Sequence, residues 1–183
     1  MAVLQVRRLG ASNHPAVPKG WTEELCELAL NELHRQELGL LEYYTIRRMP
    51  ADGMIKRSNG SVFLDGNRLV RRYADGHNPY LFFTPRNTVL AAGPEHLLLR
   101  RECAGYGKDG VAIVDLDNGM AGFHSRVSVN YLLHELGHSV YRLRHHRSGA
   151  KVCSMNNYGK NENVLHYCLG CRAKARRVEK ELT

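Results

Sequence analysis

In four stretches of this chain, apolar residues either cluster or alternate with polar residues, as expected of short strands. Such runs predict strands over residues 2–8, 40–48, 87–92 and 110–115. The sequence VAIVD within the last of these is apolar enough for the centre of a sheet, and we expect residues 102–106 to form an edge strand. Residues 79–86 have an extended pattern but no assigned place in the sheet.

Helical spacing occurs in three other stretches. From Thr22 to about Leu38, apolar residues recur four positions apart, glutamates occupy the first turn and Gly39 ends the pattern. A shorter helix is predicted over residues 67–73, and residues 49–60 are predicted to form a loop. Residues 127–146, VSVNYLLHELGHSVYRLRHH, are mostly apolar, which favours a buried helix.

The order of these elements favours an α+β fold. Strands alternate with helices, and beyond about Arg147 the chain has little regular pattern but several cysteines and histidines. A length of 183 residues is typical of a single domain. A tail of this kind is expected of a small subdomain held by a metal rather than by a large core.

Composition and charge narrow the class of protein. With 43% hydrophobic and 24% charged residues, and no apolar run of transmembrane length, the chain has the composition of a soluble protein. The segment MAVLQVRRLG lacks the features of a signal peptide, so we expect a cytoplasmic location and no membrane partner. The net charge of +8 permits nucleic-acid binding, but the basic residues are dispersed, and the densest run, 172–180, is interpreted as a solvated helix.

The candidate catalytic motif lies in the buried helix. His134 and His138 are four residues apart, so they share one helical face and can bind one zinc ion. Glu135 points off that axis, where it can accept a proton from the attacking water. Gly137, inside the motif, would let another segment pack closely against the helix.

A second candidate metal site follows the helix. Five cysteines are too few and too unevenly spaced for a disulfide framework, and Cys26 and Cys103 are expected to be small buried residues. Cys168 and Cys171 form a C-x-x-C pair, the usual knuckle of a structural zinc site, and Cys153 supplies a third thiolate. The spacing leaves the fourth ligand open among His145, His146 and His166.

Together these motifs resemble the archaemetzincins, a family of metzincin-type zinc metallopeptidases. The family signature runs His-Glu-x-x-His-x-x-Gly-x-x-His-Cys, then Cys-x-Met, then Cys-x-x-Cys. This chain has HELGH at residues 134–138, CSM at 153–155 and CLGC at 168–171, in the same order. The resemblance covers residues 134–171, and the upstream order of strands and helices is compatible with it.

The resemblance implies a fold and a set of roles. The upper subdomain, residues 1–144, would contain a mixed, mostly parallel twisted sheet and the active-site helix. The lower subdomain, residues 145–183, would contain a Met-turn at Met155 and the structural zinc site. Glu135 would be the general base. The catalytic zinc would be held by His134 and His138, and the structural zinc by Cys153, Cys168 and Cys171.

The chain departs from the signature after the second histidine. The family's glycine falls at Tyr141 and its third histidine at Arg144, which stays protonated and cannot bind zinc. A one-residue insertion repairs the match, because His145 then becomes the third catalytic ligand and His146 joins the cysteines. Alternatively the helix continues through Tyr141, which leaves His145 two turns away and the catalytic site incomplete.

We therefore expect a zinc-dependent metallopeptidase with two zinc ions per chain and a peptide or protein substrate. One alternative is a catalytically impaired protein of the same fold that keeps only the structural zinc site. Another is a basic zinc-binding nucleic-acid module, although the apolar helix gives no reason to expect nucleic acid as a partner. The sequence does not give an oligomeric state. Tyr158 and His124 are weaker candidates for the cleft.

Overall fold

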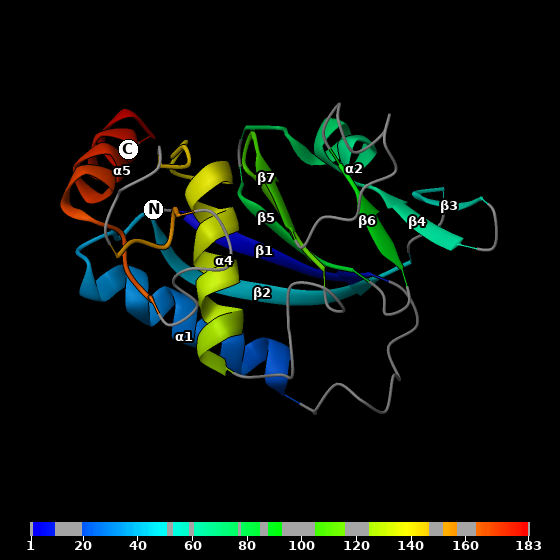
Figure 1. Ribbon diagram of the computed structural model, residues 1–183, viewed down its shortest axis with the longest axis horizontal. Helices are drawn as coiled ribbons and strands as arrows, with labels where there is room; N and C mark the ends of the chain where they lie inside the picture. The colour runs from blue at the N-terminus through cyan, green and yellow to red at the C-terminus, as the bar shows by residue number, and fades with distance from the viewer. Residues whose placement is uncertain are drawn as a thin grey trace.

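A five-stranded sheet forms the main layer of the structure, a computed structural model (Figure 1). The residues it describes are 2–9, 20–50, 53–58, 61–76, 78–84, 88–92, 105–115, 125–146, 152–156 and 164–182. The strands, in order across the sheet, are β2 (Leu41–Met49), β1 (Ala2–Leu9), β5 (Tyr80–Phe83), β8 (Val111–Val114) and β7 (Gly105–Lys108). The first four pair in parallel, and β7 pairs antiparallel with β8.

The main sheet is covered on both faces, and the side chains of its strands alternate between two cores. Leu81 and Phe83 of β5 lie in the core beneath α1 (Trp21–Arg35) and α4 (Ser125–Ser139). Phe82, between them, lies in a second core with residues of α2 (Gly66–Tyr73). Because β8 is buried on both faces, its continuous apolar run is what an interior parallel strand needs.

A second, smaller sheet lies beside α2 (Figure 1). It contains β3 (Ile55–Ser58), β4 (Ser61–Asp65) and β6 (Val89–Ala91), in that order, with β3 and β4 antiparallel. The predicted loop over 49–60 is therefore wrong at residues 55–58, because β3 gains its hydrogen bonds from β4 and not from a local pattern. The strand predicted over 87–92 exists, but it belongs to this second sheet.

Other strand and helix predictions are confirmed with small shifts in their ends. The strand patterns at 2–8, 40–48 and 110–115 correspond to β1, β2 and β8, and the extended run at 79–86 becomes β5, an interior strand. The predicted edge strand at 102–106 corresponds to β7, which lies at the sheet edge and begins at Gly105 within the described residues. The helix expected from Thr22 to about Leu38 ends at Arg35.

The C-terminal end has more regular structure than its pattern indicates. Helix α5 spans Leu169–Leu182, and its buried residues Cys171, Ala175 and Val178 are spaced four and three apart on one face. Most of its basic residues are exposed, as expected of a solvated basic helix. Figure 1 shows α5 at the end of the molecule opposite the second sheet.

The predicted fold class is confirmed: a mixed, mostly parallel sheet carries the motif-bearing helix, and the cysteine cluster lies in the C-terminal part. The boundary between subdomains at residue 144 stays a prediction. No described helix combines the length and the apolar character needed to span a membrane.

Candidate metal centres

The chain reverses direction immediately after the motif-bearing helix. Helix α4 ends at Ser139, and the amide of Leu143 donates to the carbonyl of Gly137 at 2.8 Å. The reversal occurs at Arg142, whose φ of 53° is left-handed. The alternative in which the helix continues through Tyr141 is therefore wrong. Arg142, one residue after the position of the family's glycine, thus adopts the left-handed conformation that glycine usually adopts at a helix end.

This reversal brings three imidazoles together. The Nε2 atoms of His134, His138 and His145 are mutually separated by 3.1 Å (134 to 138), 2.9 Å (134 to 145) and 2.9 Å (138 to 145). Tetrahedral zinc would space such nitrogens by roughly 3.3 Å, from bonds of about 2.0–2.1 Å. The three nitrogens thus form a triangle of the size that a single zinc ion requires.

Hydrogen bonds on the other ring nitrogens determine the tautomers of two of these histidines. Nδ1 of His134 donates to the carbonyl of Ser154 at 2.6 Å, and Nδ1 of His138 donates to that of Leu143 at 2.8 Å. In the neutral rings both Nε2 atoms then carry lone pairs that face one another across 3.1 Å with no proton between them. Such convergent lone pairs fit a metal cation, and carbonyl partners of this kind orient metal-binding histidines.

Burial favours the neutral form that metal binding needs. It lowers the pKa of His134 to about 3, with a further contribution from neighbouring His138. Burial also lowers the pKa of His138 and of His145. Neutral imidazoles are therefore the dominant form near neutral pH.

The Glu135 carboxylate lies between the helix and the edge strand β7. Its residue is 2% exposed, and a β-carbon added to Gly105 would lie 2.5 Å from Glu135 Oε1. A β-carbon on Gly107 would meet the backbone oxygen of Glu135, and it would lie 2.8 Å from His138 Cβ. Two glycines with i, i+2 spacing therefore let β7 approach the motif. No sequence prediction assigned this role to the two glycines, although the Gly-Tyr-Gly alternation on an edge strand is a signal for it.

Gly137 is the contact point for the segment beneath the histidines. A β-carbon there would overlap Met155 Sδ and lie 3.2 Å from the Tyr167 hydroxyl. The expected close packing therefore occurs, and it involves these two side chains. The Tyr167 hydroxyl donates to the carbonyl of Leu133 at 2.5 Å, a role that no sequence pattern marked.

A second group gathers His146, Cys153, Cys168 and Cys171, whose ligand atoms all lie within 4.8 Å of one another. His146 Nε2 is 3.4 Å from the Sγ atoms of both Cys168 and Cys171. Tetrahedral zinc would separate such nitrogen and sulfur atoms by roughly 3.6 Å. The structure thus brings His146 to the cysteines, whereas His166 is exposed and contributes its carbonyl to the amide of Ser154.

Cys153 lies in an environment that stabilises a thiolate. The thiol of Cys171 and the backbone amides of Cys168 and Met155 hydrogen-bond to its sulfur, with amide distances of 3.2 and 3.5 Å. These hydrogen bonds, led by that from Cys171, lower the pKa of Cys153 despite the opposing effect of burial. A thiolate, an imidazole and two further thiols form the donor set of a closed structural zinc site.

The two groups share one short scaffold. His145 belongs to the first group and His146 to the second, and Ser154, which holds His134, directly follows Cys153. The amide of His146 donates to the carbonyl of Met155 at 3.3 Å, which ties the two segments together. The structure thus places His134, His138 and His145 in the first group and His146 with the three cysteines in the second, whereas the candidate His166 is in neither. Tyr158, His124 and Cys103 lie outside the described residues.

Comparison with known proteins identifies the fold. The chain has the archaemetzincin fold. It matches the crystal structure of archaemetzincin from Methanopyrus kandleri with a TM-score of 0.64 and 16% identity, over 98% of this chain and 96% of that one. It also matches archaemetzincin from Archaeoglobus fulgidus, solved with malonate, with a TM-score of 0.60 and 12% identity, over 94% of this chain and 99% of that one. No protein-family model and no curated protein matches the sequence.

Proposed function

We propose that the protein is a zinc-dependent metallopeptidase. The observation that carries this proposal is the convergence of three histidine Nε2 atoms next to a buried glutamate. Two of these histidines donate their Nδ1 protons to backbone carbonyls. The solved archaemetzincins, whose fold the chain shares, support the same class of activity. We further propose a peptide or protein substrate.

His134, His138 and His145 would hold the catalytic zinc, and His146 with the three cysteines would hold a structural one. When bound, the catalytic zinc would supply Lewis acidity and a water activated near neutral pH. As general base, Glu135 would accept a proton from the attacking water on its carboxylate and would later deliver it to the leaving amine. Its burial between α4 and β7 keeps the carboxylate in one place for both transfers.

The edge strand provides a place for an extended substrate. Among the described residues β7 pairs with β8 alone, so within that part of the chain its outer backbone edge has no strand partner. A peptide can add to such an edge as a further strand, preferably antiparallel. Because Gly105 contacts Glu135, a peptide on this edge would pass next to the proposed base.

The geometry gives little support to a protein that lacks the catalytic zinc. That alternative arose from Tyr141 and Arg144, which replace the glycine and the histidine of the family signature. The left-handed conformation of Arg142 and the position of His145 compensate for both replacements.

Zinc content and hydrolysis together test the proposal. Elemental analysis of protein purified without chelator is expected to give two zinc ions per chain, and one in His145→Ala. His146→Ala, the matched neighbour, is expected to lose the other zinc. Glu135→Gln is expected to keep both zinc ions and lose hydrolysis of a peptide library. One zinc in both the wild type and His145→Ala, or hydrolysis retained by Glu135→Gln, would refute the proposal.

A further inference from the structure

A large cavity opens beside the proposed catalytic site. Its volume is about 740 Å³, within the range of ligand pockets, and His138 contributes to its wall. Its lining includes the turn between β7 and β8, the reversed segment 142–144, and residues near the starts of β1 and β5 such as Ala2 and Pro79. The β7–β8 turn is held to the end of α4, since the amide of Gly110 donates to the carbonyl of Ser139 at 2.9 Å. The cavity is therefore a defined part of the fold that borders a histidine of the site.

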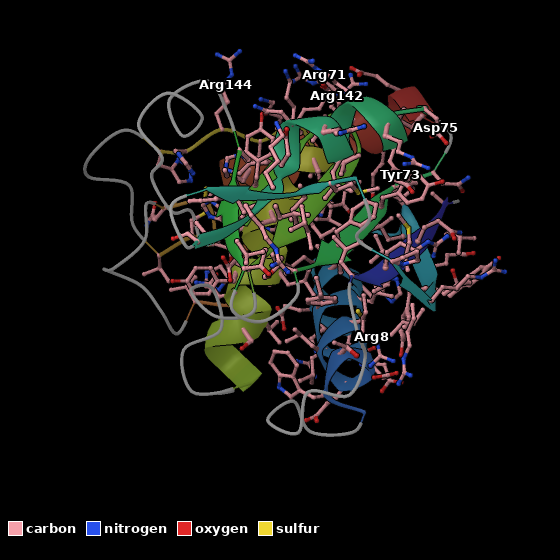
Figure 2. The ribbon with its side chains drawn as sticks, turned by 90° about the vertical axis from the view of Figure 1, so that its right-hand side faces the viewer. Arg8, Arg71, Tyr73, Asp75, Arg142 and Arg144 are labelled. Atoms are coloured by element: carbon pink, nitrogen blue, oxygen red, sulfur yellow. The ribbon has the colours of Figure 1, made fainter. Side chains whose placement is uncertain are left out.

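The charged residues around this cavity are mainly cations. Among the described residues Lys108, Arg142 and Arg144 line it, with Asp109 as the acidic residue. Asp109 lies 3.8 Å from the ammonium of Lys108, and Arg142 pairs with Glu181 at 3.6 Å. Arg144 is exposed, and it forms no ion pair with a described residue. Figure 2 shows Arg142 and Arg144 at the same edge of the molecule, with both side chains at the surface.

The direction of β7 relates this cavity to the path of a substrate. Gly105, at the start of β7, contacts Glu135, and Lys108, at its end, lines the cavity. Three residues of strand span about 10 Å. A peptide that adds antiparallel to β7 runs from Lys108 toward Gly105. Its residues near the cavity therefore precede the bond that lies beside Glu135.

We propose that this cavity is a substrate subsite that binds an acidic side chain about three residues N-terminal to the scissile bond. The proposal rests on the proposed peptidase function, since it takes the scissile bond to lie beside Glu135. Arg144 is the principal specificity-determining residue, and Lys108, which also lines the cavity, adds to the attraction. Cations that are accessible to water contribute modestly, so we expect a preference of about three- to fivefold over a neutral residue.

Binding and cleavage are measured separately. Fluorescence anisotropy with the zinc-loaded Glu135→Gln protein compares peptides that carry Glu, Gln or Lys at that position. The Glu peptide is expected to bind about three- to fivefold more tightly than the Gln peptide. Adding Arg144→Glu or Lys108→Glu is expected to remove or reverse that order. Arg47→Glu, the same charge change on β2 at the opposite edge of the sheet, is expected to leave the order unchanged.

The outcomes distinguish this inference from the proposed function. Equal binding of the three peptides, or a Glu preference that survives Arg144→Glu, overturns the subsite. Hydrolysis of the Gln peptide by the wild-type protein tests the peptidase activity independently of any preference. A preference that depends on Arg144, together with no hydrolysis of any peptide, would overturn the peptidase function and leave a cationic cavity that binds an acidic side chain.

Discussion

Replacing Gly105 with alanine tests whether the carboxylate of Glu135 must occupy its observed position. The added β-carbon would lie 2.5 Å from Oε1 and 2.7 Å from both Cγ and Cδ of Glu135. Ordinary contacts between such atoms are about 3.5 Å or longer, so the carboxylate would have to retreat by about 1 Å. The three nearest atoms all belong to the Glu135 side chain, so we expect that side chain to shift and the fold to persist.

A displacement of about 1 Å in a catalytic group lowers the rate by about 100-fold. We therefore expect Gly105→Ala to lose about two orders of magnitude in kcat/KM for a quenched fluorescent peptide, with an unchanged zinc content. Gly107→Ala should behave differently, because its β-carbon meets the backbone oxygen of Glu135, which cannot rotate away. We expect it to destabilise the fold by about 1–3 kcal/mol, the usual cost of overpacking.

The assay compares hydrolysis, zinc content and thermal unfolding in the same preparations. Gly39→Ala is a matched control, because its added β-carbon would have no atom within 4 Å. Each kcal/mol of destabilisation should lower Tm by about 2–4 °C in a chain of this size. Full activity in Gly105→Ala would refute the assignment of Glu135 as the base at this position. A normal Tm in Gly107→Ala would refute the close packing of β7 on α4.

Three further predictions concern stability. Burial alone would raise the pKa of Asp65, the N-cap of α2, but hydrogen bonds from Lys56 and the Arg68 amide, together with the charges of both residues, lower it overall. The stabilising contribution of the Asp65 carboxylate should therefore be complete above about pH 4 and be lost as pH falls through the lower folded pKa. Urea unfolding at pH 7 should show a loss of about 1 kcal/mol in Asp65→Ala, and a smaller loss in Asp65→Asn, which keeps the cap. Because Arg142 is left-handed, Arg142→Gly should be more stable than Arg142→Ala by about 1 kcal/mol in the same assay, and equal stabilities would contradict the observed φ of 53°. Tyr167→Phe removes the hydrogen bond to Leu133 and should cost about 0.5–1.5 kcal/mol; an unchanged free energy of unfolding would show that this bond contributes nothing.

Local patterns in the sequence were sufficient for most elements of the main sheet and for the candidate metal ligands. The apolar run of β8 and the i+4 spacing in α1 are properties of a few neighbouring residues, and they predict elements regardless of the rest of the chain. His134 and His138 could be paired in the same way, because one turn of helix fixes their relative positions. Cys168 and Cys171 form a similarly local pair.

Tertiary structure decided what depends on contacts between distant segments. Strand β3 exists because β4 pairs with it. Strand β7 can approach Glu135 because Gly105 and Gly107 lack side chains, and the need for glycine at these positions arises only when β7 packs against α4. The division of His145 and His146 between two groups required the chain to reverse at Arg142, a residue type that does not indicate a turn. The sequence by itself determined which side chains could bind metal. Only the folded chain decided which of them meet, because hydrogen bonds and packing from other segments set the direction of the backbone between them.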